Sequence, residues 1–347
     1  MLAFQADLDA AGPDDVAAVI ARHVAPDYRW RGVYPFAEQN GADAVAKVFW
    51  EPLRRAMGPM QRRPDVFLAG FNDVVVDQRL VDAESEGRAD DEPVWVCQMG
   101  HHLGLFDEPW LDIPPTNKMC FVRYAEFNAV AGGRITESAV FVDVISVMRQ
   151  AGHYPLPPQT GSSHIYPGPM THDGLLLEPQ AEQEGVATMD LVNRMCTDLF
   201  EANRIANEGG DDRVPAEVLA RTWHHDMIWS GPEGIGATYT IERYQQQHQY
   251  PFRFNLGAKD FNGHVARFAE GTYACFFGWP NLTNTPTGGF LGLPGNDVRA
   301  DMRVVDVYRR RDDKLAENWV FIDLLHWLKM QGLDVLERMR QLNGERF

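Results

Sequence analysis

The sequence predicts an α+β fold that is built twice within one chain of 347 residues. The duplication is indicated by residues 111–152, which can be laid over residues 291–332 without a gap. The fold class is indicated by the order of elements, because each copy starts with helical patterning and ends with strand patterning. Helices that precede a run of antiparallel strands pack on one face of the resulting sheet, which gives an α+β domain.

The repeat is clearest in two stretches that share a spacing of apolar residues around a central aspartate. TESAVFVDVISVMRQAG occupies residues 136–152, and AENWVFIDLLHWLKMQG occupies residues 316–332. Long-period self-similarity of this kind indicates repeated structural units. Upstream, the alignment pairs DYRWRG at 27–32 with DMIWSG at 226–231, and GHHLG at 100–104 with GTYAC at 271–275.

The two copies define two predicted domains, residues 1–150 and 185–347, joined by a linker at 151–184. The linker is rich in Pro, Gly and Ser, a composition typical of connecting segments. The first copy is longer in its middle, where the acidic segment at 82–93 predicts a surface loop. The second copy is longer at 278–289.

Helix and strand patterning can be placed within the second domain. Residues 187–207 carry apolar side chains three and four positions apart, which predicts a helix. MRVVDVYRR and LAENWVFIDLL, separated by the polar turn RDDK, predict an antiparallel hairpin. Because alternate strand residues share a face, Trp319, Phe321 and Asp323 point one way and the aliphatic residues between them point the other. Both faces are apolar, so this strand is expected to be covered on both sides.

Composition limits the classes of partner. The formal net charge of −17 disfavours nucleic acid and anionic membranes, because their phosphates would repel the chain. The four cysteines lack metal-ligand spacing and suit a reducing compartment better than a disulfide framework. The first residues do not form a secretory signal pattern, and no apolar run reaches the roughly 20 residues of a membrane span. We therefore expect a cytoplasmic protein with no nucleic-acid or membrane partner.

Two motifs resemble those of SnoaL-like polyketide cyclases. GHHLG followed by PPTNK at 114–118 is similar to the family's Gly-Thr-His-x-Gly and Pro-Pro-Thr-Gly-Lys, and ENWVFID at 317–323 is similar to its Glu-x-Trp-x-x-x-Asp. The resemblance covers both halves and implies a tandem member of the nuclear transport factor two superfamily. It implies two cone-shaped, barrel-like α+β domains. In each, N-terminal helices would pack on a curved antiparallel sheet that encloses a pocket.

The family motif is divided between the two copies. The first copy keeps His102 but has Ala139 where the family has Trp. The second copy keeps Trp319 but has Tyr273 in the position that the alignment gives to His102. The last motif ends in the family's catalytic acid/base, which implies that role for Asp323 and for its counterpart in the first copy.

Asp143 and Asp323 are therefore the leading catalytic candidates. A carboxyl walled by Trp and Phe loses solvation, which raises its pKa and allows proton exchange near neutral pH. A structural interpretation stands beside this one, because each Asp precedes a predicted helical turn. As the N-cap of that turn it would stabilise the helix by about 1 kcal/mol.

His102 and Tyr273 complete the catalytic candidates. His102 would orient or polarise a carbonyl group beside Asp143, and Tyr273 would donate a hydrogen bond to an oxyanion. The structural interpretations are a hydrogen-bonded core histidine and a buried strand tyrosine.

Six further residues are candidates for the wall of a ligand pocket, since apolar walls with a few polar groups build small-molecule sites. Aromatic residues at such positions are equally typical of a protein core. His326 occurs in the second copy alone, which suggests that the two pockets have diverged, one to bind or catalyse and one to a structural role. The substrate-binding candidates are Trp30, Trp229, Trp319, Phe141, Phe321 and His326.

Three functions agree with the sequence. The first is an enzyme of the lyase or isomerase type that needs neither cofactor nor metal. It would use a pocket Asp for aldol cyclisation, dehydration or isomerisation of a small, largely apolar carbonyl compound. The second is a non-catalytic small-molecule binding protein with two diverged pockets, and the third is a scaffold with vestigial pockets. In this superfamily sheets pair in dimers, so a homodimer or an intramolecular pseudo-dimer is expected.

Overall fold

The computed structural model describes residues 1–73, 92–164, 167–209, 214–257 and 259–344. Of the predicted surface loop at 82–93, all but the last two residues lie outside the described residues. The described residues divide into two compact units, each held together by contacts among its own residues. Unit 1 contains residues 1–72, 92–155 and 323–344, and unit 2 contains residue 73 and residues 156–322.

Unit 1 is built on a six-stranded sheet in the order β2-β1-β6-β5-β4-β3. β1 and β6 are parallel, and the other neighbouring strands are antiparallel. The strands are β1 (Val24–Gly32), β2 (Ala37–Asn40), β3 (Gln61–Phe71), β4 (Val94–Phe106), β5 (Lys118–Ala131) and β6 (Arg134–Val142).

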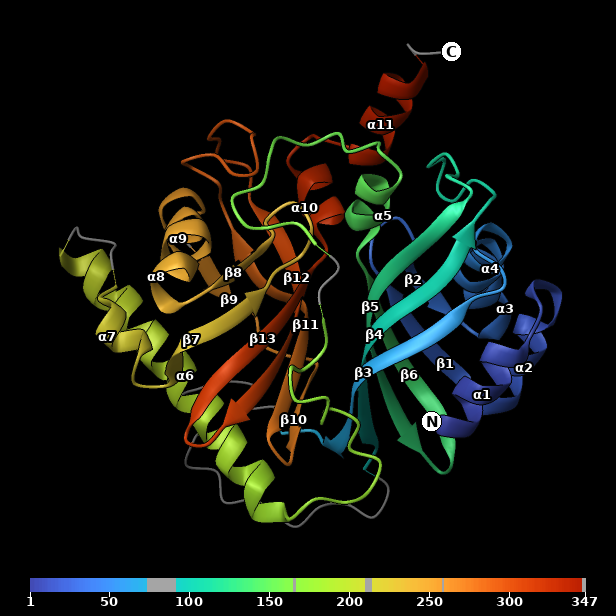
Figure 1. Cartoon of the computed structure of the whole chain (residues 1–347), viewed down its shortest axis with the longest axis horizontal. Coiled ribbons are helices and arrows are strands. Elements are labelled where there is room, and N and C mark those ends of the chain that lie inside the picture. The colour runs from blue at the N-terminus through green and yellow to red at the C-terminus, as the bar shows by residue number, and fades with distance from the viewer. Residues whose placement is uncertain (74–91, 165–166, 210–213, 258, 345–347) are drawn as a thin grey trace. The chain divides into compact units, whose positions relative to one another are not determined.

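Helices cover one face of the first sheet, as Figure 1 shows for α1 to α4. These are α1 (Leu2–Ala10), the 3₁₀ turn η1 (Pro13–Asp15), α2 (Val16–His23), α3 (Ala42–Val45), the π-helical turn η2 (Ala46–Trp50) and α4 (Glu51–Ala56). α5 (Val144–Gln150), α10 (Leu324–Met330) and α11 (Val335–Gly344) also belong to unit 1. Tyr34 ties α10 and α11 into this unit, because its hydroxyl donates to Asp334 at 2.9 Å and accepts from Lys329 at 2.6 Å.

Unit 2 repeats this plan. Its sheet has the order β10-β11-β12-β13-β7-β8, with β9 paired to β11, and β7 runs parallel to β13. Its strands are β7 (Trp223–Ser230), β8 (Ala237–Tyr239), β9 (Lys259–Phe261), β10 (Ala266–Glu270), β11 (Tyr273–Asn284), β12 (Ala300–Arg311) and β13 (Lys314–Ile322). Its helices are α6 (Glu182–Gly209), α7 (Ala216–Leu219), α8 (Ile241–Tyr244), the π-helical turn η4 (Gln245–Gln249) and α9 (Tyr250–Asn255).

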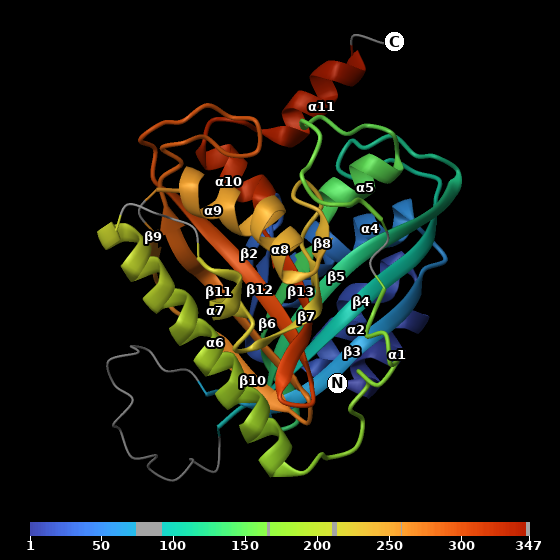
Figure 2. The same cartoon turned by 60° about the vertical axis from the view of Figure 1, so that its left-hand side comes forward.

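The two sheets have the same succession of strands. Each unit also has a π-helical turn shortly before a proline, which is Pro52 in unit 1 and Pro251 in unit 2. The predicted α+β class is confirmed, with two sheets in which antiparallel pairs predominate. The helix predicted at 187–207 lies within α6, which crosses the second sheet over β10 and β11 (Figure 2).

Part of the predicted linker extends the second sheet. Gly161 N donates to Ile235 O, and Ser162 forms a bridge with Ala237 at the outer edge of β8. A Cβ on Gly161 would lie 2.6 Å from the backbone of Gly236, so the close approach requires glycine. The linker therefore covers an edge that would otherwise present unpaired backbone groups.

The outer face of the second sheet holds the far end of the linker. Arg309 donates to both oxygens of Asp173, at 3.2 and 3.0 Å, and Tyr273 OH donates to Asp173 Oδ1 at 2.5 Å. Partial burial raises the pKa of Asp173, but these hydrogen bonds and that of Thr171 outweigh it and hold the pKa at about 2. The carboxylate is thus ionised and bound at neutral pH.

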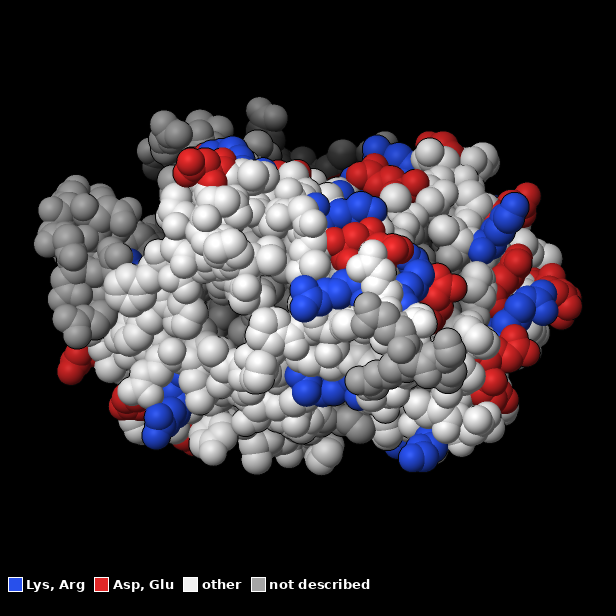
Figure 3. All heavy atoms as spheres, turned by 90° about the horizontal axis from the view of Figure 1, so that it is seen from above, with Lys and Arg blue, Asp and Glu red and all other residues white. Residues whose placement is uncertain are grey.

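Charged side chains of both signs lie beside one another on the face drawn in Figure 3. Ion pairs such as Arg340–Asp112 at 2.7 Å and Lys329–Asp334 at 3.1 Å are of this exposed kind. Such pairs contribute little to stability individually, because water competes for both partners. Within the described ranges, none of the helices combines the length and the apolar character that crossing a membrane requires.

Candidate functional site

A cavity of about 250 Å³ lies between the helices and the inner face of the second sheet, the face that α6, α8 and α9 cover. Its floor is made by alternate residues of β12 and β13. Its roof comes from Met195 and Leu199 of α6 and from Tyr244, His248 and Phe252 of the other helices. Large apolar side chains line most of it, which suits an apolar ligand.

Asp306 brings a carboxylate into this cavity. It stands on β12 between Val305 and Val307, and alternation on the strand turns its side chain to the inner face. Among the described residues, two neutral donors bind the carboxylate. Tyr308 OH donates to Oδ1 at 3.1 Å, and Asn318 Nδ2 donates to the same oxygen at 3.2 Å. Both donors reach Oδ1, so Oδ2 is the oxygen available to a ligand.

Burial raises the pKa of Asp306 to about 6, and the hydrogen bonds from Asn318 and Tyr308 oppose this only in part. The physical cause is the loss of water around a charge that no described cation neutralises by a direct contact. A carboxyl with this pKa is present in both protonation states near neutral pH. It can therefore accept and return a proton under physiological conditions.

Trp229 and His248 form the aromatic end of the cavity. Their rings stack with centroids 3.9 Å apart and planes inclined by 19°. Burial lowers the pKa of His248 to about 3, so its imidazole is neutral at pH 7. A neutral imidazole has one N–H to donate and one nitrogen to accept, whichever tautomer it adopts.

The first unit fills the equivalent space differently. Glu126 occupies the position of Asp306, because Glu126 pairs with Val140 on β6 as Asp306 pairs with Val320 on β13. Its carboxylate accepts from Asn128 at 3.1 Å and lies 3.5 Å from Arg62 Nη1. The acid of the first unit is thus paired with a cation, whereas Asp306 is held by neutral groups.

Further hydrogen bonds close this network in unit 1. Tyr28 donates to Ser138, and Ser138 donates to Asn128, at 2.9 and 2.6 Å. Arg62 also binds Asp9 and Gln98. The polar groups on the inner face of the first sheet are therefore largely engaged with one another, which favours a structural role for this interior.

His102 lies in this first interior, on the inner face of the sheet. Its ring stacks on Tyr124 at 4.3 Å and meets Trp50 edge-on at 5.7 Å. Burial lowers its pKa well below the ordinary value, and the charges of Arg62 and Arg54 add to this. Tyr124 and His102 lie on the inner face of the sheet, whereas Arg123, the neighbour of Tyr124 on β5, points to the opposite face. Asp143 lies 3.9 Å from Arg123 and therefore on that opposite side. The predicted partnership of His102 with Asp143 is not formed.

Tyr273 does not occupy the position equivalent to His102. It pairs with Arg309 at one end of β11, and its counterpart by strand register is Trp95. The sequence alignment misplaced it by seven residues, because it gave the second copy too long an insertion; the register shows two additional residues, between Gly278 and Leu282 of β11. The phenol binds Asp173 of the linker, as described above. Its environment is that of a structural anchor.

Asp143 and Asp323 cap helices. Ser146 N donates to Asp143 Oδ1 at 3.0 Å, and His326 N donates to Asp323 Oδ1 at 3.2 Å. Asp323 Oδ2 also accepts from Tyr34 N at 3.0 Å. Each Asp is thus the N-cap of the helix that follows it, as the structural interpretation of the sequence predicted. Neither Asp lines the cavity of unit 2.

Of the six predicted wall residues, Trp229 lines the cavity. Trp319 points to the opposite face of β13, where its Nε1 donates to Pro167 O at 3.0 Å. The cavity wall is formed instead by the alternate residues Asn318, Val320 and Ile322. Trp30, Phe141 and Phe321 are fully buried core residues, and the backbone of His326 takes part in the cap of α10.

The sequence did contain a signal for Asp306. The strand MRVVDVYRR places one acidic residue within an apolar run, which is costly unless the acid is paired or functional. His248 gave a weaker signal, since it lies in a polar stretch, QQQHQ, that reads as exposed. Among the described residues, no group of three His, Cys, Asp or Glu side chains is arranged to hold a metal ion.

These features define an α+β domain whose helices close an apolar cavity over one face of an antiparallel sheet, with a buried acid inside it. Residues 268–330 match the family model described as SnoaL-like polyketide cyclase. The match covers β11, β12, β13 and α10, and it confirms for this part of the chain the resemblance found in the sequence. No curated protein matches the sequence.

Solved structures with similar folds each cover less than half of this chain. A candidate SnoaL-like polyketide cyclase from Jannaschia sp. CCS1 is 19% identical over 45% of this chain and 92% of its own, with a TM-score of 0.30. An NTF2-like protein from Burkholderia xenovorans LB400 is 13% identical over 42% of this chain and 96% of its own, with a TM-score of 0.32. Scores of this size do not establish a function.

The capping role predicts a loss of stability when Asp323 is changed to Ala. We expect Asp323→Ala to lower the free energy of unfolding by about 1–2 kcal/mol, because the helix loses its side-chain cap. Asp323→Ser should recover part of this loss, since serine is also a favourable N-cap. Urea denaturation followed by circular dichroism measures both. Equal losses in the two variants would contradict the cap.

The raised pKa of Asp306 predicts that Asp306→Asn stabilises the protein at neutral pH. In the unfolded chain this carboxyl ionises near pH 4, whereas in the folded chain it ionises at about 6. Ionisation of this group therefore lowers the free energy of unfolding of the wild type as the pH rises from 4 to 6, and the loss persists above pH 6. It amounts to at most about 3 kcal/mol.

Asparagine carries no charge, so Asp306→Asn removes this penalty. The stability difference between variant and wild type should be near zero at pH 4 and reach its largest value above pH 6. Asp313→Asn, which removes an exposed turn carboxylate, is the matched control and should show no such trend. Urea denaturation at several pH values makes the comparison. A destabilised Asp306→Asn at pH 8 would refute the raised pKa.

Proposed function

We propose that this protein is a SnoaL-like acid/base enzyme that needs no cofactor and acts on a small, largely apolar carbonyl compound. The reaction would take place in the cavity of unit 2, with Asp306 as the group that carries the proton. This replaces Asp143 and Asp323, whose oxygens bind the backbone of capped helices. The observation that carries the proposal is a partly buried carboxylate that faces a largely apolar cavity and, among the described residues, is held by two neutral donors.

The chemistry follows from the protonation states. The ionised Asp306 accepts a proton from the carbon next to the carbonyl group, so that the C–H bond breaks. Its electron pair forms a C=C bond, and the carbonyl electrons move to oxygen. His248, which is neutral, lines the same cavity and can donate a hydrogen bond to the resulting enolate oxygen. Return of the proton to another carbon, loss of a leaving group or attack on a second carbonyl then completes isomerisation, dehydration or cyclisation.

A binding protein without catalysis is the second candidate. It is favoured by the two hydrogen bonds that Asp306 Oδ1 accepts, which would also fix a carboxylate that merely recognises a ligand hydroxyl. The two candidates differ in one respect, since only an enzyme transfers a proton between Asp306 and a carbon atom of the ligand.

Hydrogen–deuterium exchange at carbon separates them. The probe is 6-methoxy-1-tetralone, an uncharged bicyclic ketone, incubated with the protein in D₂O and followed by proton NMR. We expect exchange next to the carbonyl that exceeds the background and rises with pH around a midpoint of about 6, because the ionised acid is the base. Asp306→Asn should lower the exchange at least 100-fold, in the range expected for loss of a general base.

Asp323→Ser is the matched control, since it keeps a helix cap while removing the other candidate acid. It should exchange the ketone at the wild-type rate. Loss of exchange in Asp323→Ser with retention in Asp306→Asn would return the catalytic role to Asp323. Binding of the ketone without any exchange in the wild type would support the binding protein instead.

A further inference from the structure

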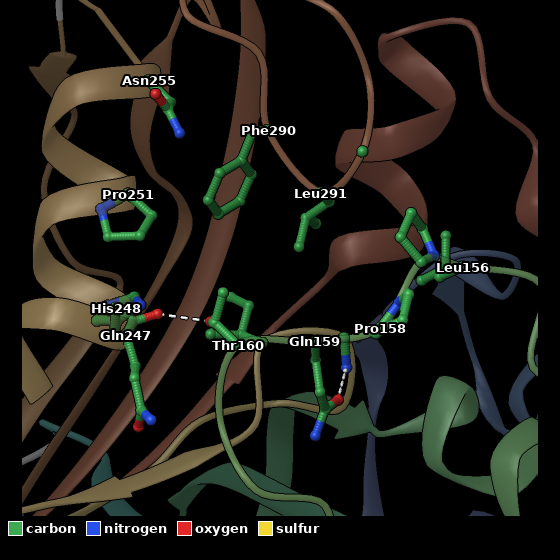
Figure 4. A pocket seen from close by; sticks show the side chains of 14 residues that line it. Leu156, Pro158, Gln159, Thr160, Gln247, His248, Pro251, Asn255, Phe290 and Leu291 are labelled. Carbon is green, nitrogen blue, oxygen red and sulfur yellow. Dashed lines mark hydrogen bonds between the residues drawn. The ribbon is translucent and has the colours of Figure 1, made fainter. Parts of the chain in front are cut away.

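A second hollow of about 270 Å³ adjoins the cavity of unit 2, and His248 lines both. Figure 4 shows walls from the helical segment that holds Gln247 and Pro251, from the linker through Leu156 and Thr160, and from the connection that carries Phe290. Residues 234 and 235 also line the hollow. The hollow is therefore built in part by the segment that joins the two halves of the chain.

The linker is fixed at this place by hydrogen bonds between its own side chains and the backbone of neighbouring segments. Thr160 Oγ1 donates to Gln247 O at 2.6 Å, and Gly234 N donates to Gln159 Oε1 at 2.9 Å. Gln247 lies in the π-helical turn η4, in which the wider coil changes the hydrogen-bond partners of the backbone carbonyls. The hollow thus has a defined wall on both sides.

The lining of the hollow is uncharged and carries amide groups. Gln159, Gln247 and Asn255 contribute amides, and no Asp, Glu, Lys or Arg is among the lining residues in the described part of the chain. Such amides can donate a hydrogen bond to an oxygen of a neutral ligand or accept one from its hydroxyl group.

We propose that this hollow is a second subsite of the same ligand. It would take an uncharged tail that bears a hydroxyl or carbonyl oxygen, while the ketone part occupies the cavity beside Asp306. His248 lines both spaces, which puts the subsite for the tail next to the cavity for the ketone part. The substrate class is then an elongated neutral molecule with an apolar carbonyl end and a polar oxygen-bearing end. This inference rests on the proposed function for the position of the ketone part alone.

A matched pair of probes tests the subsite. 6-Methoxy-1-tetralone has no tail, and 6-(3-hydroxypropoxy)-1-tetralone carries an uncharged hydroxyl tail. We expect the tailed ketone to bind the wild type at least tenfold more tightly by isothermal titration calorimetry. Thr160→Trp should fill the hollow and abolish this preference without changing the Kd of the methoxy compound. Thr160→Ser keeps the hydroxyl bond to Gln247 and should keep the preference.

A second variant is included in case the first does not fold. Leu156→Trp fills the hollow from another position and should act like Thr160→Trp. Equal Kd values for the two ketones in the wild type would overturn the subsite. So would a Thr160→Trp or Leu156→Trp variant that weakens both ketones alike while circular dichroism shows a native fold.

The outcomes also separate this inference from the proposed function. Exchange of the methoxy ketone together with equal Kd values for the two ketones would support the proposed enzyme and refute the subsite. A tenfold preference for the tailed ketone without exchange would support the subsite and refute the enzyme. Asp306→Asn should keep the preference while losing exchange, and absence of binding by either ketone counts against both proposals.

Discussion

The burial of one carboxylate without a cationic partner is the constraint on which the account of unit 2 depends. Taking a carboxylate out of water is unfavourable, and two hydrogen bonds from neutral donors compensate only partly. The sheet tolerates the cost because Asp306 is fixed between apolar neighbours on a central strand. An acid held in this way is neither fully ionised nor fully protonated near pH 7, which is the state that proton transfer to carbon requires.

The first unit shows what the same position becomes when the charge is neutralised. Glu126 meets Arg62 there, and the polar groups around it are bound to one another. A charge pair of this kind occupies the interior with side chains that bind one another. In unit 1 the acid is Glu126, its partner is an arginine, and the interior is structural. In unit 2 the acid is Asp306, its partners are Tyr308 and Asn318, and the interior leaves room for a ligand. The two halves share a strand order and differ in their inner faces.

Much of the architecture could be predicted from the sequence, and the candidate site could be predicted only in part. The α+β class follows from local patterning, and it was confirmed, although two strands stand between the helices of each unit, β1 and β2 in the first and β7 and β8 in the second. The pocket face was assigned to Trp319 and Phe321, because both faces of β13 are apolar and periodicity alone cannot say which one the helices cover. Tyr273 was misplaced because the alignment gave the second copy a longer insertion than the two residues that enter β11. The two capping aspartates resembled buried acids because a cap at the end of a covered strand is itself buried.

The most direct test is the titration of Asp306 itself. Carbon-13 NMR of the side-chain carboxyl carbons in aspartate-labelled protein, recorded between pH 3 and 9, follows each carboxyl group separately, and Asp306→Asn assigns the resonance. The account predicts one aspartate that titrates with a midpoint near 6 and disappears from the spectrum of the variant. An Asp306 resonance that titrates near 4, as an aspartate in water does, would contradict it.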